Sequence, residues 1–357
     1  MSKISVAILF GGKSVEHAIS INSAKNIYEY IDKDKFDVSL IGISQQGQWY
    51  LKDTVDGDFS HCTLLQYSLD SDQKGFVNTQ DGSLISPDII FPVLHGTDGE
   101  DGSIQGMLTT MDLPFVGTGV LGSAISMNKL YSKRLMNAAK IPTSKFIDFT
   151  DDQKESISFD EVRSRLGLPF MTKAANLGSS VGIFKVVDEP TFKQAVDEVF
   201  KYDHTMLCEA FIEGRELECA VMGNESPEAS TPGEIVVSKD YEFYTYEAKY
   251  LDPKAASIEV PADVTPAIAE KIKELSIRAY RTLHCEDFAR VDLFLQDDGE
   301  ILINEINTIP GFTNSSMFPM MWQNHGISFT DLITKLIELA QDRFEKHKNL
   351  VKTYKPA

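Results

Sequence analysis

The segment of this chain that is richest in chemistry runs from residue 289 to 311, with the sequence ARVDLFLQDDGEILINEINTIPG. Its Asp298-Gly299 dipeptide is typical of a two-residue hairpin turn. A turn there places Asp292 opposite Glu305, and side chains two positions apart on a strand share a face. Four polar side chains are therefore predicted on one face of the hairpin: Arg290, Asp292, Glu305 and Asn307.

Two carboxylates and an amide oxygen on one face are hard ligands suited to Mg²⁺, which typically also keeps substrate phosphates as ligands. Arg290, one step away, could stabilise an anion beside the metal. The alternative is a polar face that only contacts solvent. Against it, the opposite face is predicted to be apolar, with Val291, Leu293, Leu295, Leu302 and Ile306. The polar face itself becomes apolar towards the turn, with Phe294, Ile301 and Ile303. This abrupt change along one face favours the floor of a cleft.

Two further segments could bind a nucleotide. In TKAANLGSSVG (172–182), a strand delivers Lys173 and a Gly-Ser-Ser loop follows, which could approach a phosphate closely. The alternative is a plain β-turn, because the segment matches neither common phosphate-loop pattern. In CEAFIEGRELE (208–218), acidic residues flank a linker at Glu213-Gly214. Taken with the other two segments, it resembles a segment that lines a binding site for adenine and ribose between two domains.

The elements that must position these residues follow an α/β pattern. The apolar run at 3–10 predicts a strand, a glycine turn follows, and apolar residues at helical spacing predict a helix over 19–31. With further strands at 38–44 and 87–95, a parallel sheet is expected through about residue 125. Later strands are expected at 168–175, 181–187, 206–212, 216–223, 233–238, 287–296 and 300–306, and helices at 128–141, 191–203, 265–284 and 327–346. Residues 239–257 lack periodicity and predict a long functional loop.

The composition narrows the class of protein. Of 357 residues, 42% are hydrophobic and 24% charged, which excludes a wholly disordered chain. The net charge of −19 disfavours nucleic acid and anionic lipid as partners. No apolar stretch approaches the length of a membrane span, and the N-terminal run is interpreted as a buried strand and not a signal peptide. Four scattered cysteines, without zinc spacing, fit a reduced cytosolic protein: Cys62, Cys208, Cys219 and Cys285.

In combination, these residues resemble the bacterial D-alanine–D-alanine ligases of the ATP-grasp group, over essentially the whole length. The resemblance is carried by LFGGKSVEHAIS (9–20), FPVLHGTDGEDGSIQG (91–106), VGTGVLGSAISMNK (116–129), LGSSVG (177–182), RELE (215–218), YEAKY (246–250), RVDLF (290–294) and INEINTIPGFTNSSMFP (303–319). It implies a three-domain α/β ATP-grasp fold with an N-terminal parallel-sheet domain (1–126), a central domain (127–213) and a C-terminal domain (214–357) carrying the active-site loop 239–257. ATP would lie between the central and C-terminal domains.

The resemblance also implies an activity. ATP would phosphorylate the carboxylate of one D-alanine, and the amine of a second would attack the acyl phosphate to give D-alanyl-D-alanine for peptidoglycan synthesis. The enzyme would be a cytoplasmic homodimer. Two Mg²⁺ ions, with Mn²⁺ as a substitute, would be held by Asp292, Glu305 and Asn307. ATP would be bound by Lys129, Lys173, Glu209, Ala210, Phe211, Ile212, Glu216 and Asn304.

The remaining roles implied by the resemblance concern the substrate. Glu16 would hold the ammonium of the first D-alanine, and His95 would lie close to its carboxylate. Arg290 and the N–H of Gly311 would form the oxyanion hole. Ser316 and Met317 would receive the carboxylate of the second D-alanine. Glu16, Ser179 and Tyr250 would form a hydrogen-bonded set that closes the long loop over the site.

Several of these residues have simpler explanations. His95 could be a hydrogen-bonded core histidine, Glu16 could complement a helix dipole, Tyr250 could be an ordinary loop aromatic, and Met317 could be packing. The chain also departs from the family pattern at Ala18, Asn128 and Ala174, and the last two bear on ATP affinity.

Two other functions compete with this interpretation. One is a related ligase that makes D-alanyl-D-lactate or D-alanyl-D-serine, which the Lys249-Tyr250 pair disfavours. The other is a non-catalytic nucleotide-binding regulator, which would need damaged metal ligands, whereas Asp292, Glu305 and Asn307 are intact.

Overall fold

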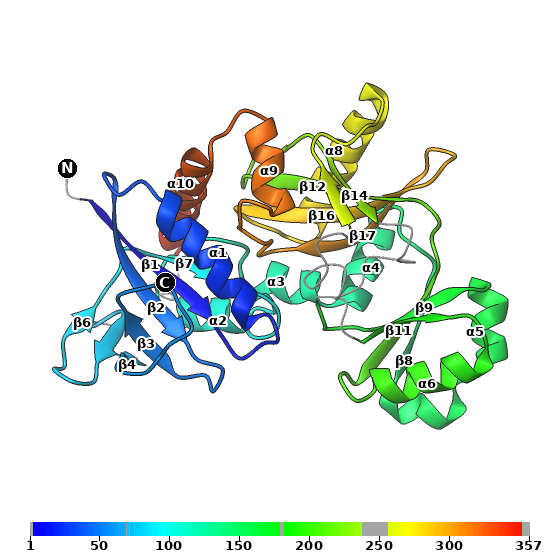
Figure 1. Ribbon diagram of the computed structural model, residues 1–357, viewed down its shortest axis with the longest axis horizontal. Helices are drawn as coiled ribbons and strands as arrows, with labels where there is room; N and C mark the ends of the chain where they lie inside the picture. Colours follow the sequence, from blue (N-terminus) through cyan, green and yellow to red (C-terminus); the bar gives the residue numbers. More distant parts are fainter. Residues whose placement is uncertain (1–2, 69, 71, 179–181, 238–255, 352–357) are drawn as a thin grey trace, which may run out of the picture.

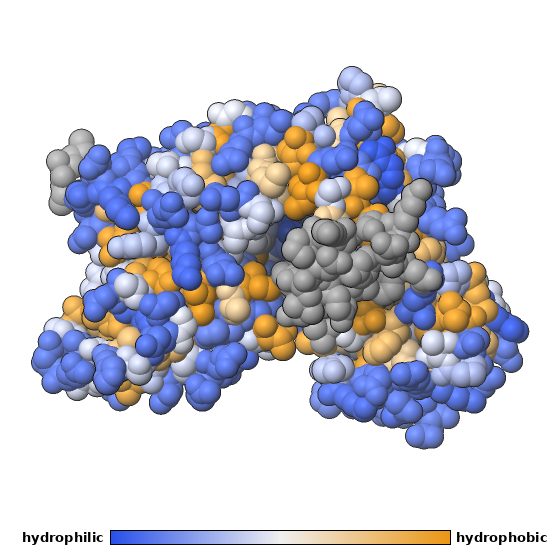
Figure 2. Space-filling view, in the orientation of Figure 1, coloured by the Kyte–Doolittle hydropathy of each residue, from blue (hydrophilic) through white to orange (hydrophobic). Residues whose placement is uncertain are grey.

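The computed structural model describes residues 3–68, 70, 72–178, 182–237 and 256–351. These residues build three β-sheets with helices packed around them (Figure 1). Polar and charged side chains cover most of the face seen in Figure 2, in keeping with the acidic composition. None of the four cysteines, all within the described ranges, forms a disulfide. No helix in the described part of the chain is long and apolar enough to cross a membrane.

The first sheet has the strand order β6-β5-β4-β3-β2-β1-β7. Its strands are β1 (Ile4–Gly11), β2 (Phe36–Ile43), β3 (Trp49–Lys52), β4 (Thr63–Tyr67), β5 (Phe76–Asn78), β6 (Leu84–Ile85) and β7 (Ile89–Val93). Only β7, β1 and β2 run parallel; β3 to β6 extend the sheet with antiparallel pairings. The predicted parallel sheet is therefore correct for its buried part and incomplete at its edge. The helices around it are α1 (His17–Tyr30), α2 (Ser103–Thr110) and α3 (Val120–Met127).

The second sheet, β10-β9-β11-β8, is antiparallel throughout. It comprises β8 (Phe146–Thr150), β9 (Phe170–Ala174), β10 (Ile183–Val186) and β11 (Thr205–Ala210), with α4 (Lys129–Ala138), a 3₁₀ helix (Asp151–Ser156), α5 (Phe159–Leu166) and α6 (Glu189–Val199). Helix α6 begins where the sequence dictates, because the Asp188 side chain caps it and a proline lies in its first turn. Its buried face packs Phe192 edge-on against Phe170 of β9.

The third sheet has the order β15-β14-β12-β16-β17, with β13 beside β12. It comprises β12 (Arg215–Met222), β13 (Glu228–Ala229), β14 (Gly233–Val237), β15 (Ala256–Glu259), β16 (Phe288–Leu295) and β17 (Ile301–Asn307), and α8 (Pro266–Thr282) follows β15 in the chain. Alternate residues of the central strands, such as Leu217 and Val291, form one core with Leu275 of α8. The other face of these strands is apolar at one end, where Ala220, Met222 and Phe288 join another core, and polar at the other end.

The last two helices, α9 (Met317–Asn324) and α10 (Phe329–Lys348), connect the first and third sheets (Figure 1). Their apolar residues share one core with β1, β7 and α1. Arg343 of α10 donates to the carbonyl of Gly117 at 2.8 Å and to the fully buried Asp287 at 2.9 Å. The C-terminal helix thus holds the N-terminal sheet in a fixed place beside the sheet that carries β16 and β17.

Candidate active site

The β16–β17 hairpin brings the predicted polar residues together, but not through the predicted turn. Its loop has three residues, 297–299, because Gln296 pairs with Glu300 and Gly299 has a φ of +83°. A β-bulge between Asp292 and Leu293 then shifts the register back, so that Asp292 pairs with Glu305 and Arg290 with Asn307. The two-residue turn was therefore wrong, and the pairing that it was meant to produce is confirmed.

The bulge also exchanges apolar residues between the two faces. Leu302 pairs with Phe294 on the polar face, whereas Ile301 and Ile303 join the core with Val291. This is the reverse of the prediction for Ile301, Leu302 and Ile303, because a one-residue shift moves each side chain to the other face. Ile306, on the other side of the bulge, lies in the core as predicted. The extra residue on β17 is Asn304, which the bulge places at the wall of the cleft beside Glu305.

A row of three carboxylates crosses the third sheet on its polar face. Glu218 of β12 pairs with Asp292 of β16, which pairs with Glu305 of β17. Glu218 is 5% exposed and was not predicted as a site residue. The alternation in RELE indicates that Glu216 and Glu218 share a face, but the pairing of β12 with β16 cannot be derived from the sequence.

Arg290 lies against this row and neutralises part of it. Its Nε lies 2.7 Å from Asp292 Oδ1 and 2.9 Å from Glu218 Oε2, and a second nitrogen donates to Asp292 Oδ2 at 2.8 Å. Burial opposes the positive charge, but the two carboxylates outweigh it and raise the pKa of Arg290 well above its usual value. Asn307 also donates to Asp292, at 2.9 Å. The guanidinium is thus fixed and charged beside the acidic row.

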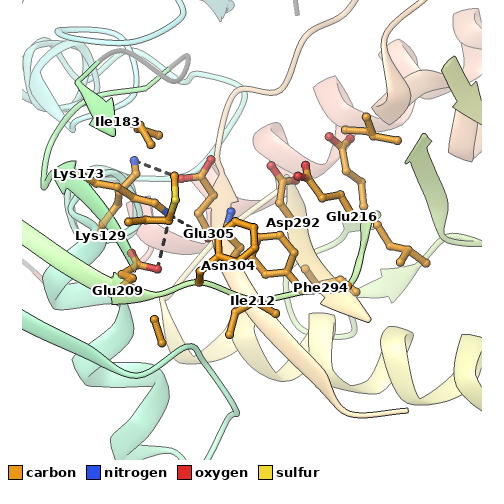
Figure 3. A pocket seen from close by; sticks show the side chains of 18 of the residues that line it. Lys129, Lys173, Ile183, Glu209, Ile212, Glu216, Asp292, Phe294, Asn304 and Glu305 are labelled. Atoms are coloured by element: carbon orange, nitrogen blue, oxygen red, sulfur yellow. Dashed lines mark hydrogen bonds and ion pairs between the residues drawn. The ribbon is translucent and has the colours of Figure 1, made fainter. Parts of the chain in front are cut away.

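A cavity of about 360 Å³ opens between the second and third sheets (Figure 3). Its walls come from β9, β10 and β11 on one side and from β12, β16 and β17 on the other. The predicted residues that line it are Lys129, Lys173, Glu209, Ala210, Phe211, Ile212, Glu216, Asp292, Asn304 and Glu305. Asn307 lines a smaller hollow that shares Lys129 and Glu305 with it. The structure therefore gathers all of the predicted nucleotide and metal residues around one place.

At one end of the cavity, lysines meet carboxylates (Figure 3). Lys129 Nζ lies 3.1 Å from Glu305, and Lys173 Nζ lies 3.5 Å from Glu209 and 3.4 Å from Asn304 Oδ1. Burial alone would raise the pKa of Glu209, but Lys133 and Lys173 lower it to about 2. Lys133, 3.2 Å from Glu209 and only 1% exposed, was not predicted. In the sequence it is one of three lysines on the predicted helix 128–141, and nothing there distinguishes a buried one.

We expect Lys133→Met to destabilise the fold strongly, because it removes one of the two lysines that balance the charge of the buried Glu209. Breaking a buried pair costs about 3–5 kcal/mol. The pKa of Glu209 is lower in the folded state than in the unfolded chain. The ionised Glu209 carboxylate therefore stabilises the fold above about pH 4.3, and this contribution is lost as the pH falls towards 2. The change in the free energy of unfolding between pH 3 and 7, measured with urea, should therefore be smaller in the variant.

The matched control is Lys154→Met, which removes a lysine 2.7 Å from Asp197 in an exposed pair. Exposed pairs contribute little to stability, so this variant should unfold like the parent protein. Equal unfolding midpoints for the two variants would mean that Lys133 has no structural role at the cavity.

The N-terminal part of the site contains two carboxylates. Glu16 directly precedes α1 and is 8% exposed, and its Oε2 lies 2.6 Å from the place where a Cβ on Gly96 would stand. Glycine there leaves room for the carboxylate. Burial, and then the charge of Glu16, raise the pKa of Glu100 to about 8. Glu100 was not predicted, although it lies in the quoted segment 91–106.

His95 is 5% exposed and uses both ring nitrogens within the protein. Nδ1 lies 2.9 Å from the carbonyl oxygen of Ile309, and Nε2 lies 3.0 Å from Ser23 Oγ. Burial lowers the pKa of His95, which favours the neutral ring. This geometry favours the alternative of a hydrogen-bonded core histidine over a direct contact with a substrate carboxylate.

Three predicted substrate residues follow β17. A Cβ on Gly311 would stand 2.9 Å from Ser316 Oγ, so the two residues are adjacent. Ser316 lies at the N-terminus of α9 and accepts from the N–H of Thr313 at 3.0 Å. Met317 is 4% exposed and belongs to the core, as the packing alternative has it. Ser179, Tyr250 and most of the predicted loop 239–257 lie outside the described residues.

The departures from the family pattern have local explanations at two positions. Asn128 caps α4 by accepting from the N–H of Tyr131, and its amide donates to Asn176 at 2.7 Å. It therefore places Lys129 at the first position of that helix. Ala174 is 1% exposed at the end of β9, next to Lys173.

Comparisons with known proteins identify the family. Residues 5–118 match the family described as D-ala D-ala ligase N-terminus, and residues 135–338 match D-ala D-ala ligase C-terminus. The chain is 49% identical to the D-alanine–D-alanine ligase A of Escherichia coli K12, covering 96% of this chain and 97% of the relative. It is 47% identical to the D-alanine–D-alanine ligase of Shouchella clausii, covering 98% of each.

Solved structures give the same result. The D-alanine–D-alanine ligase from Coxiella burnetii has a TM-score of 0.86 at 36% identity, covering 98% of this chain and 97% of that one. The VanG D-Ala:D-Ser ligase from Enterococcus faecalis has a TM-score of 0.87 at 34% identity, covering 95% of this chain and all of that one. With both family halves matched in order and relatives near half identity over nearly the full length, the chain belongs to the D-alanine–D-alanine ligase family.

Proposed function

We propose that the protein joins two D-alanines into D-alanyl-D-alanine with ATP, for peptidoglycan precursor synthesis. The observation that carries the proposal is the convergence of Lys129, Lys173, Asp292 and Glu305 on one cavity, with Arg290 fixed beside it. A cavity of about 360 Å³ is within the usual range for small-molecule sites. We further propose domains at 1–126, 127–213 and 214–357, with ATP between the second and third.

In this proposal, ATP lies along the cavity. The strand end Ala210–Ile212 and Glu216 contact the adenosine, and Lys129 and Lys173 contact the phosphates. Glu209 acts mainly by holding Lys173, since its carboxylate lies 3.5 Å from that lysine and in the same buried group as Lys133. Asn304, placed on the wall by the bulge, completes the set.

The residues at the cavity rim fit Mg²⁺ in their chemistry. Among the described residues, no group of three or more His, Cys, Asp or Glu is arranged to hold a metal by itself. The proposed ligands are instead two facing carboxylates and an amide: Asp292, Glu305 and Asn307. Such oxygen ligands, completed by phosphate oxygens, suit Mg²⁺ or Mn²⁺. The metal, proposed as two ions, would neutralise charge on the phosphates.

The proposed chemistry has two steps. The carboxylate oxygen of the first D-alanine attacks the γ-phosphorus, releasing ADP and giving an acyl phosphate. The amine of the second D-alanine then attacks the carbonyl carbon, and phosphate leaves with the bridging oxygen while the amine loses a proton. Arg290 and the N–H of Gly311 stabilise the oxyanion that forms in between.

The substrate contacts are proposed from charge. Glu16 and Glu100 are near enough for one to raise the pKa of the other, so a cationic ammonium beside Glu16 would relieve their repulsion. This supports Glu16 as the site of the first D-alanine's ammonium. Ser316, with Met317 behind it, receives the carboxylate of the second. Closure by Ser179 and Tyr250 stays a prediction, as do the cytoplasmic location and the homodimer.

The alternative of a D-serine or D-lactate acceptor concerns only the second subsite. The similarity of fold does not separate the acceptors, because a D-Ala:D-Ser ligase has a TM-score of 0.87 with this chain. Relatives named for D-alanine reach 47–49% identity over nearly the full chain, which favours D-alanine as the acceptor. The intact pairing of Asp292 with Glu305 disfavours a non-catalytic regulator.

The test measures ADP formation and product mass with MgATP and D-alanine, alone or with D-serine or D-lactate. We expect ADP formation that depends on D-alanine, with D-alanyl-D-alanine as the main product in every mixture. A predominance of the mixed products would establish a different acceptor, and absence of ADP formation with any of these substrates would contradict the proposed activity.

A further inference from the structure

The segment that follows β17, residues 309–312, is held in place by three side chains from the N-terminal part of the chain. They are Ser23 of α1, His95 after β7 and Glu100 in the next turn. Two of the three, Ser23 and His95, are buried at 0% and 5% exposure. Gly311, the proposed oxyanion donor, lies within this segment.

On one side of Gly311, both backbone polar groups of Ile309 have partners. The Ile309 N–H donates to Glu100 Oε1 at 3.2 Å, and the Ile309 carbonyl accepts from His95 Nδ1 at 2.9 Å. Glu100 is itself fixed, because its Oε2 accepts from the N–H of Gly96 at 2.7 Å. The peptide groups before and after Ile309 are thereby both oriented by one short turn of the chain.

On the other side of Gly311, the N–H of Phe312 donates to Ser23 Oγ at 3.2 Å. Because a carbonyl can only accept, His95 Nδ1 must carry the ring proton, and the neutral ring then accepts at Nε2. Ser23 therefore donates to His95 Nε2, at 3.0 Å, while it accepts from Phe312. One continuous chain of hydrogen bonds thus connects the residues on either side of the Pro310-Gly311 dipeptide.

This arrangement leaves the dipeptide little freedom. Proline fixes its own φ, and the peptides before and after the dipeptide are anchored. We infer that Ser23, His95 and Glu100 are positioning residues that aim the N–H of Gly311 at the reacting carbonyl. The inference rests on the proposed function and deepens it. Packing of Phe312 in its aromatic cluster would hold the segment in the core, but only directional bonds fix the angle of an N–H.

The test uses Glu100→Gln and Ser23→Ala, which loosen the segment on opposite sides of Gly311. Glutamine keeps one acceptor oxygen and replaces the other with an NH₂ group, so one backbone N–H loses its partner. Misplacement of a donor by about 1 Å can cost up to about 100-fold in rate. We expect dipeptide formation to fall about 10- to 100-fold in each variant, with the KM for ATP and D-alanine changed less than threefold.

The decisive measurement is the ratio of ADP to dipeptide formed. An oxyanion donor acts after the acyl phosphate exists, so both variants should still form ADP with D-alanine, and water should consume part of the intermediate. The ratio should rise above one. A purely structural role would reduce the amount of active enzyme, lower both products equally and leave the ratio unchanged, which would overturn the inference.

Asp101→Asn is the matched control. Asp101 also accepts two backbone N–H bonds, from Asp98 at 2.9 Å and Ser103 at 3.0 Å, within the same turn and without contact to Ile309. It should keep a ratio of one. A raised ratio in this control, or failure of both test variants to fold, would also overturn the inference. A parent protein that makes no dipeptide would instead contradict the proposed function.

Discussion

Replacing Arg290 with methionine is expected to leave MgATP binding within a few-fold of the parent protein while dipeptide formation falls about 10²–10³-fold, the usual cost of losing one oxyanion donor. The arginine is fixed by Asp292 and Glu218 at 2.7 and 2.9 Å, beside the cavity and not among its nucleotide-lining residues. Its charge should therefore matter most when negative charge grows on the reacting carbonyl. Turnover and ATP affinity are measured separately, by product formation and by calorimetry.

The variant also leaves the buried Glu218 and the half-buried Asp292 with less compensation, so its stability must be followed by thermal unfolding with MgATP present. Arg290→Lys is the matched control, since it keeps the charge and loses the planar fork that contacts both carboxylates. It should recover part of the lost rate. Near-normal turnover in Arg290→Met would remove Arg290 from the proposed oxyanion hole.

The second large effect is expected for Glu305→Gln. Glu305 pairs directly with Asp292 and lies 3.1 Å from Lys129. One substitution therefore removes a proposed metal ligand and the partner of the lysine proposed to bind phosphate. Since loss of an outer partner of a metal ligand alone costs about 10- to 100-fold in metal affinity or activity, loss of the ligand itself should cost at least about 100-fold in rate. The Mg²⁺ concentration for half-maximal rate should rise, as measured by Mg²⁺ titration at saturating ATP and D-alanine.

Glu300→Gln is the control for Glu305→Gln, because Glu300 is an exposed carboxylate on the same hairpin. It should titrate with Mg²⁺ like the parent protein. If Glu305→Gln kept the parent's Mg²⁺ dependence, the metal site would have to be sought elsewhere.

The hairpin shows how far sequence reasoning reaches in this protein. The types and alternation of Arg290, Asp292, Glu305 and Asn307 indicate a polar site on one face. The length of the turn and the bulge at Asn304 depend on the fit between neighbouring strands and on β17's contact with residues 142–143, which no local pattern contains. The extra residue in the turn and the extra residue in the bulge cancel each other in the register. The predicted pairing of Asp292 with Glu305 was therefore right, while the assignment of Leu302 and Ile303 to faces was wrong.

Residues that act through distant partners were beyond the sequence. Glu218 gains its place only when β12 pairs with β16, and Lys133 only when Glu209 of β11 lies opposite α4. Ser23, His95 and Glu100 are far in sequence from the segment 309–312 that they hold. By contrast, strands with a long apolar run, such as β1, were predicted well, because the run itself indicates burial. The short strands β3 to β6 contain no such run.

The most direct test of the central claim follows the oxygen atoms. The enzyme is supplied with MgATP and D-alanine whose carboxylate carries ¹⁸O, and the phosphate and dipeptide are analysed by mass spectrometry. If the carboxylate attacks the γ-phosphorus and the amine then displaces phosphate, each dipeptide is accompanied by one phosphate containing a single ¹⁸O, and one ¹⁸O remains in the new peptide carbonyl. Dipeptide formed together with unlabelled phosphate would contradict the acyl-phosphate route and the roles assigned to Arg290 and Gly311.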